Sequence, residues 1–486
     1  MTPTLIFSVI VIYFIALITI SFITSKGADS DAFFTGNKQS PWYLVAFGMI
    51  GTSLSGVTFI SVPGDVGKAG VGFAYFQVVL GYLVGYAIIA TVLMPLYYRL
   101  NLVSIYTYLQ DRLGYWSYKT GAFIFLISRT IGSSLRLYLA ANVLQIFLFQ
   151  GFGVPFWATV TITILLIWVY TFKGGIKTIV WTDSFQTIFL ISSVIICVIT
   201  ISNTLHLDLQ SFFEMFRSDS MTQIFHFEDA NSKLFFPKQF IGGAFLAIAM
   251  TGLDQDLMQK NLTCKNIGEA QKNMLWFTVI MTIVTFLFLT LGVLLYKFAA
   301  FKNIAIPSSS DDLFPLLALN EFGKFAGIFF LLGIIASSYA SADSALAALT
   351  TSFCIDFLHF DKKDEAQKQR QKLFVHIGFS VIFLIVILIF KELNETSLIY
   401  AVLGIAALTY GPLLGLYSFS LFTNYKVNDK LVPYICVISP AICYTLNTYS
   451  KEIFNGYQFG YELLLVNGII TFIGLWLVRK KLKDLN

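Results

Sequence analysis

The sequence predicts an all-α integral membrane protein with about 13 transmembrane helices, and three observations support this fold class. First, 57% of the 486 residues are hydrophobic and only 12% are charged, with a mean hydropathy of +0.75. Soluble domains carry about 25% charged residues. Second, apolar runs of about 20 residues recur along the whole chain. Third, these runs lack the alternating polarity of a transmembrane barrel. The composition excludes an ordinary soluble enzyme, a disordered chain and a nucleic-acid binder.

The apolar runs define the predicted spans in order. They are 3–24, 41–62, 71–98, 120–149, 155–172, 180–203, 237–258, 273–299, 325–356, 373–391, 397–423, 431–448 and 460–478. The first span has the position of a signal peptide. It has no basic N-terminal region, however, and no small-residue cleavage site follows it. We therefore interpret it as a retained helix.

Lys and Arg are unevenly distributed over the loops between the spans. About two thirds of the 32 basic residues fall in one set of loops, and short loops rich in these residues are usually cytoplasmic. An odd number of crossings places the termini on opposite sides. We therefore expect a multi-pass protein of the cell (plasma or inner) membrane, with the N-terminus outside and the C-terminus in the cytoplasm. Neither long loop, 204–236 or 300–324, can hold a second domain.

The cysteines and histidines give no sign of a catalytic centre. The five Cys show no CxxC or CxxH spacing, and the four His form no cluster. This pattern favours neither a disulfide framework nor a zinc site. We expect no enzyme and no catalytic residues.

The span 325–356 contains a stripe of hydroxyl groups. Ser337, Ser341 and Ser344 recur at helical spacing and share one face, with Ser338 beside them. Small residues of this kind also allow close helix packing. Asp343 in the same stretch favours a row of oxygen ligands for a hard cation.

Glycines interrupt two spans that are five crossings apart, 41–62 and 237–258. Helices broken at corresponding positions of two halves indicate an inverted repeat, with an ion and a solute bound at the breaks. Within a single transmembrane transporter domain, 1–486, we therefore expect broken first and sixth core helices. The expected parts are an extra N-terminal helix (3–24), a first five-helix repeat (41–203), a second inverted repeat (237–423), and two C-terminal helices with a tail (431–486).

Two arginines and one amide lie at membrane depth. Arg129 and Arg136 are seven residues apart and face nearly the same way. Either guanidinium can bind a solute carboxylate in bidentate fashion, or pair with an Asp of the bundle. Gln77 needs a hydrogen-bond partner, which packing or a solute can supply.

One stretch resembles a family signature. Residues 174–186, GGIKTIVWTDSFQ, are similar to the GG-x-K-x-V-x-W-T-D-x-x-Q pattern of the sodium:solute symporter family. The resemblance continues in residues 33–64 and 254–266 and covers nearly the whole chain. It implies the five-plus-five inverted repeat fold first seen in leucine transporters, whose core begins at span 41–62.

The resemblance also implies where sodium binds. Gly51 and Leu54 match the backbone carbonyl ligands of the broken first core helix. Aligned on the serines, the facing ligands are Ser337, Ser338 and Ser341. Aligned on residues 354–356, they are Ser337, the Ala340 carbonyl, Ser341 and Ser344. In some members a second sodium binds at a position that matches Asp183, and Asp343 stands where a neutral residue is expected.

The family's solute pocket is matched by residues from several spans. The matching candidates are Ser53, Ser55, Thr58, Phe73, Gln77 and Arg129. Gln77 and an arginine near 129 resemble the pocket of sialic-acid-transporting relatives. Ala247 and Met250 replace the aromatic gate and the Asn of sugar-binding relatives, which argues against a plain hexose.

Together these observations predict a sodium-coupled secondary active symporter that imports a small organic solute, of an anionic or sugar-acid-like kind, by alternating access. Na⁺ is the expected co-transported ion. The expected partners are the solute, sodium and membrane lipid, without nucleic acid, in a monomer or weak dimer. The alternatives are a proton-coupled or inorganic-anion transporter of the same fold and, less favoured, a transporter-like membrane sensor.

Overall fold

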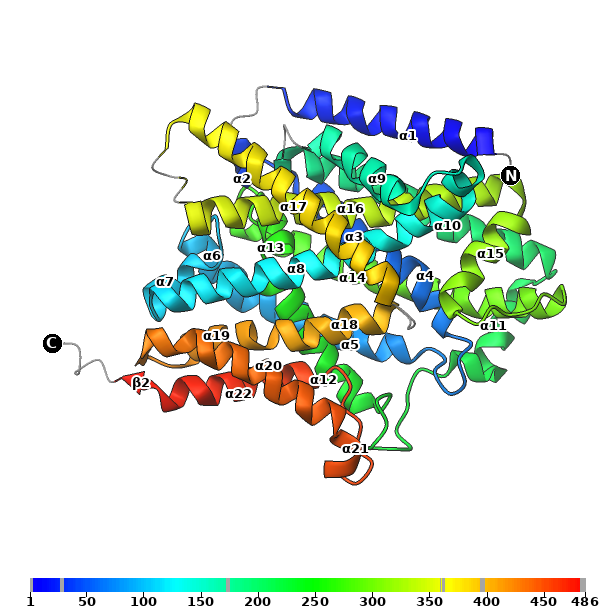
Figure 1. Ribbon diagram of the computed structural model, residues 1–486. Helices are drawn as coiled ribbons and strands as arrows, with labels where there is room; N and C mark the ends of the chain where they lie inside the picture. The colour runs from blue at the N-terminus through cyan, green and yellow to red at the C-terminus, as the bar shows by residue number, and fades with distance from the viewer. Residues whose placement is uncertain are drawn as a thin grey trace.

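The computed structural model describes residues 3–26, 30–171, 175–358, 360, 363–393 and 398–480. Residues 172, 174 and 397 and the last six residues of segment 431–486, which our predictions include, lie outside this part. Figure 1 shows the helices as one elongated bundle, with α1 (Pro3–Thr24) along one edge. Helices α19 (Gly411–Phe422), α20 (Val432–Thr448) and α22 (Leu463–Leu477) lie on the opposite edge.

The described chain is almost entirely helical. Besides the four helices just given, it forms α2 (Ser30–Thr35), α3 (Trp42–Ser53), α4 (Gly56–Asp65), α5 (Ala74–Ile88), α6 (Met94–Arg99), α7 (Thr107–Arg112), α8 (Tyr115–Leu144), α9 (Phe156–Thr171), α10 (Gly175–Thr204), α11 (Leu209–Ser218), α12 (Phe236–Ala247), α13 (Gln255–Asn261), α14 (Ile267–Phe301), α15 (Leu313–Asn320), α16 (Gly323–Leu358), α17 (Glu365–Leu393), α18 (Leu398–Thr409) and α21 (Ser450–Ile453). The two short strands β1 (Lys426–Val427) and β2 (Arg479–Lys480) pair antiparallel.

Each predicted span overlaps a described helix or a broken helix. Within the described residues, eight helices qualify as membrane spans by length and composition, or ten if the bent pairs α3/α4 and α18/α19 each count as one. Helices α9 and α22 are shorter and apolar. The number of membrane crossings, about 13, therefore remains a prediction.

The first break lies where the glycines of span 41–62 place it. Helices α3 and α4 meet at 58°, because Leu54 (ψ 67°) and Ser55 (ψ 175°) leave helical geometry. Both residues are only 2% exposed. Backbone groups released from a helix inside the bundle need polar partners, so this break is a natural place for an ion.

The second break lies near the C-terminal end of span 237–258, directly after Gly252. Helix α12 continues through a π-helical turn, Ile248–Gly252, and Asp254 then takes an extended conformation and caps α13. Gly243 does not interrupt the helix. A Cβ atom there would lie 2.2 Å from the carbonyl oxygen of Val78, so Gly243 allows α12 to press against α5.

Helix α16 lies at the centre of the bundle. It packs against α8, α10, α3 and α4, and every residue from Gly333 to Ser352 is buried. A helix buried on all sides by other helices needs small residues for close approach. The alanines and serines of this stretch supply them, and they bring Ser337–Ser344 beside the α3/α4 break.

Candidate functional site

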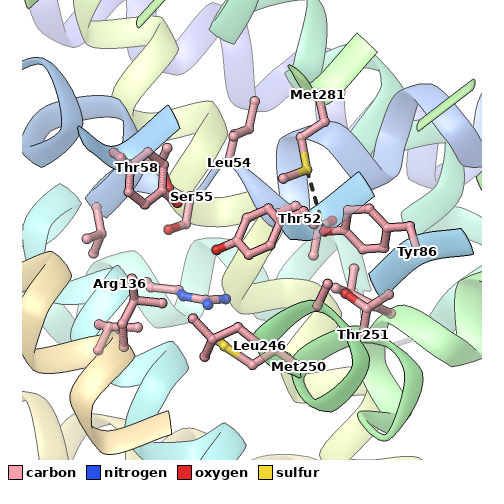
Figure 2. Close-up of a pocket in the computed structure, with 18 of the residues that line it drawn as sticks. Thr52, Leu54, Ser55, Thr58, Tyr86, Arg136, Leu246, Met250, Thr251 and Met281 are labelled. Atoms are coloured by element: carbon pink, nitrogen blue, oxygen red, sulfur yellow. Dashed lines mark hydrogen bonds between the residues drawn. The ribbon is translucent and has the colours of Figure 1, made fainter. Parts of the chain in front are cut away.

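A cavity lies beside the α3/α4 break (Figure 2), and the space within its outline, part of which is open solvent, is about 660 Å³. Its walls are largely apolar and aromatic with a few polar groups, which is typical of small-molecule sites. The residues that line it include Thr52, Ser53, Leu54, Ser55 and Thr58 at the break, Tyr75, Tyr82 and Tyr86 of α5, Arg129 and Arg136 of α8, and Leu246, Ala247, Met250 and Thr251 of the second broken helix.

Arg136 directs its guanidinium group into this cavity, as Figure 2 shows. Its Nη1 donates a hydrogen bond to Ser341 Oγ at 3.2 Å. Its Nε has no hydrogen-bond partner among the described residues. The ion pairs of the described part of the chain do not include it. A buried cation without a counter-ion is costly, so the cavity is suited to an anion.

Arg129 also lines the cavity, but carboxylates neutralise its charge. Its Nη2 forms an ion pair with Asp256 Oδ2, and its Nη1 lies 3.8 Å from Asp254 Oδ2. Tyr410 donates to Asp254, and Ser344 donates to Asp256. The sequence allowed each arginine either to bind a solute or to pair with an Asp of the bundle, and Arg129 forms the ion pair.

The other predicted solute residues divide into two groups. Ser53, Ser55 and Thr58 line the cavity. Phe73 and Gln77 are not among the residues that line it. The Gln77 amide binds the Leu234 carbonyl (3.0 Å) and the His226 amide N–H (3.2 Å). The Phe73 ring packs against Phe216 and Phe286. Both residues fasten segment 205–236 to the bundle.

Helix α16 comes close to the broken helix at the predicted first sodium site. A Cβ atom on Gly56 would lie 2.1 Å from Ser338 Oγ, and one on Gly51 would lie 3.6 Å from Ala340 Cβ. The Ser338 hydroxyl is buried without a hydrogen-bond partner in the described chain. Ser341 faces Arg136, as described above.

The other two serines of the stripe have different partners. Ser337 donates to the Ile334 carbonyl of its own helix at 3.0 Å. Ser344 belongs to the Asp256 network. The structure thus places Ser338 and Ser341 toward the break and the cavity, and Ser344 toward α13.

Asp183 of α10 lies in a buried ion pair with Lys260 of α13. Thr52 donates a hydrogen bond to Asp183 Oδ2 at 3.0 Å, and Lys260 Nζ binds the Thr52 hydroxyl. The second sodium ligand implied by the resemblance therefore already has a cation beside it.

The sequence interpretation missed several residues of the site. Lys260 falls between the predicted spans 237–258 and 273–299 and was therefore interpreted as a loop residue. In the structure it lies on α13, beyond the second break, and its side chain is buried. Tyr75, Tyr82 and Tyr86 have helical spacing, so an aromatic stripe on α5 was visible in the sequence. Nothing in the sequence alone pairs Tyr410 with Asp254.

The chain is similar in sequence to known membrane transporters. A model of the sodium:solute symporter family matches residues 33–430. Sodium-coupled monocarboxylate transporter 2 of Bos taurus is 26% identical over 420 residues, covering 82% of this chain and 65% of that protein. The sodium/sialic acid symporter NanT of Aliivibrio fischeri is 23% identical over 454 residues, covering 91% of this chain and 88% of that protein.

A solved structure confirms the predicted fold class. A sodium-coupled sialic acid symporter in a substrate-bound, outward-open state has a TM-score of 0.82 to this chain at 19% identity, and the match covers 98% of this chain and 99% of that one. The chain spans about 65% of the length of the mammalian monocarboxylate transporters that it matches.

Proposed function

Because the chain belongs to the sodium:solute symporter family, we propose that it is a sodium-coupled secondary active symporter for a small organic anion. The proposal that the solute is an anion rests on Arg136, which faces the cavity without a carboxylate partner among the described residues. Guanidinium groups bind carboxylates through two parallel hydrogen bonds. The aromatic walls from Tyr75, Tyr82 and Tyr86 would hold the rest of the solute.

The solute class follows from the same arginine. Relatives of the chain are named for transport of monocarboxylates and of sialic acid, and both kinds of molecule carry a carboxylate. We propose a monocarboxylate or a sugar acid, with the carboxylate at Arg136. Arg129 has its charge taken up by Asp256 and would shape the cavity rather than bind the anion.

Sodium would bind between the α3/α4 break and α16. The proposed ligands are the carbonyls of Gly51 and Leu54 and the hydroxyls of Ser338 and Ser341. Ser341 also accepts a hydrogen bond from Arg136, so one hydroxyl touches both proposed sites. Each ligand would then raise the affinity for the other, since coupling between two sites is reciprocal.

The proposed cycle uses the two broken helices as one moving unit. Sodium and solute bind from one side, the bundle that contains both broken helices rocks against the rest of the chain, and both ligands leave on the other side. We place this process in the cell membrane with the N-terminus outside, because the Lys and Arg bias favours it. No covalent step and no catalytic residue is required.

A thermal-shift experiment tests the proposal. The purified chain is melted in sodium or in potassium buffer with sialic acid, with propionate, or with glucose as a neutral hexose. A ligand that binds the folded protein raises its melting temperature. We expect at least one carboxylate to do so in sodium only, and glucose to have no effect. Equal stabilisation in potassium would contradict sodium coupling, and stabilisation by glucose alone would contradict the anion assignment.

A further inference from the structure

Lys260 is a buried lysine that lies next to the carboxylate of Asp183. It lies on α13, just beyond the second break, and is 1% exposed. Its Nζ ion-pairs with Asp183 and binds the Thr52 hydroxyl. Thr52 Oγ1 also lies 3.3 Å from the carbonyl oxygen of Ala340. The ammonium group therefore sits beside a carboxylate and a hydroxyl where α3, α10 and α16 meet.

These oxygens are of the kind that a hard cation requires. Sodium prefers carboxylate, hydroxyl and carbonyl oxygens, as other hard cations do. A lysine ammonium carries the same charge, and two cations at contact distance in a dry interior repel strongly. Asp183 Oδ2 accepts from both Lys260 and Thr52. A sodium ion could use this oxygen only after Lys260 had moved away. The other oxygen, Asp183 Oδ1, has no hydrogen-bond partner among the described residues, but it belongs to the same carboxylate, whose charge Lys260 already balances.

We propose that Lys260 is a built-in cation that takes the place of a second sodium at Asp183, so that the chain binds one sodium, at the α3/α4 break. This inference rests on the proposed sodium-coupled function and adds its stoichiometry. Each cycle then carries one sodium, because the lysine charge stays attached to the protein.

The same lysine couples the two broken helices. Through Asp183 and Thr52 it joins α13, which follows the second break, to α10 and to the last turn of α3 before the first break. The lysine side chain is covalently part of α13, so its contacts tie that helix to α10 and α3. A bound sodium ion is not attached to any helix in this way. The ion pair therefore provides both the charge and a fixed connection between the two halves.

The remaining buried carboxylate of this region, Asp343, has another neighbour. Its Oδ2 accepts a hydrogen bond from Tyr170 of α9 at 2.8 Å, and its Oδ1 has no hydrogen-bond partner among the described residues. It lies outside the set of residues lining the cavity. Asp343→Asn is therefore a suitable control for the loss of a carboxylate near Lys260.

Equilibrium binding of radioactive sodium to the purified full chain, without solute, tests the inference. We expect one bound sodium in the wild type, in Asp183→Asn and in Asp343→Asn. In Lys260→Ala, the freed Asp183 should recruit a second sodium. The double variant Lys260→Ala/Asp183→Asn should return to one. Size-exclusion chromatography shows which variants fold.

The contrary results are distinct. Two sodium ions in the wild type, with one lost in Asp183→Asn, would overturn the built-in cation. One sodium in a folded Lys260→Ala variant would also overturn it. If Lys260→Ala does not fold, the wild-type stoichiometry still decides. No sodium binding in any protein would instead overturn the proposed sodium coupling, on which the inference rests.

Discussion

The serines of α16 show how the partners of a side chain determine what it can bind. Ser344 already donates a hydrogen bond to Asp256. Ser338 has the same hydroxyl on the same helix, but it is buried with no partner in the described chain. Leaving a buried polar group unpaired costs about 1–3 kcal/mol, and a bound sodium ion would remove that cost. The free hydroxyl is thus better suited to the ion.

This contrast gives a matched pair of variants. Ser338→Ala removes a proposed sodium ligand and should weaken sodium binding about tenfold, equivalent to about 1.4 kcal/mol. Ser344→Ala should leave sodium affinity unchanged, although it removes a hydrogen bond to Asp256. The midpoint of sodium-dependent stabilisation in a thermal-shift titration measures both. Equal weakening by the two substitutions would remove Ser338 from the sodium site.

Arg136 gives the second prediction at this scale. Arg136→Gln removes the cation that faces the cavity and should weaken carboxylate binding by about 1.5–3 kcal/mol, the value of a hydrogen bond to a charged group. Arg136→Lys keeps the charge but loses the bidentate geometry, so it should recover part of the affinity. The dissociation constant of the carboxylate found in the thermal-shift screen is the measurement. Unchanged affinity in Arg136→Gln would mean that the anion binds elsewhere.

At the scale of elements, the α3/α4 break depends on a glycine contact as well as on backbone angles. Gly56 begins α4 where Ser338 of α16 approaches most closely, and a Cβ atom there would overlap Ser338 Oγ. Gly132, inside α8, has no atom within 4 Å of its would-be Cβ. Gly56 is therefore required for close packing against Ser338, whereas Gly132 has room for a larger side chain.

A pair of Gly→Ala substitutions tests this difference. Gly56→Ala should destabilise the protein by about 1–3 kcal/mol through overpacking and should also weaken sodium binding, because it displaces Ser338. Gly132→Ala should be neutral or stabilise by up to about 1 kcal/mol, since alanine favours the helix. Melting temperatures with and without sodium report both effects. A neutral Gly56→Ala would mean that the break does not depend on this contact.

The sequence predicts the elements better than it predicts their partners. Apolar runs of membrane length reveal the spans because lipid imposes that length, and Gly51 and Gly56 correctly mark the first break. In the second span, Gly252 lies directly before the break, whereas Gly243 permits close packing against α5; a glycine of either kind looks the same in the sequence. The role of Lys260 could not be predicted either, since a lysine near a span end is normally a loop residue and its partner is 77 positions away.

At the scale of the whole molecule, buried charges connect helices that lie far apart in the chain. Arg129 of α8 pairs with Asp256 of α13, and Tyr410, at the bend between α18 and α19, donates to Asp254. A second pair joins Lys260 of α13 to Asp183 of α10. Helix α13 is thus connected to α8 on one side and to α10 on the other through side chains that are almost completely buried. Any rocking of the bundle must either preserve these contacts or break them at a high cost.

A double-mutant cycle measures how strongly this network holds the fold together. Arg129→Gln leaves two buried carboxylates without their cation and should destabilise the protein by about 3–5 kcal/mol. Adding Asp256→Asn removes one of those carboxylates, so the double variant should be more stable than Arg129→Gln alone. Because the pair is in direct contact, the coupling energy should reach about 0.5–3 kcal/mol. Melting of the four proteins in sodium-free buffer gives that energy, and strictly additive effects would show that Arg129 and Asp256 contribute independently. In that case Arg129 would be free to bind the solute, and the assignment of the anion to Arg136 alone would have to be revised.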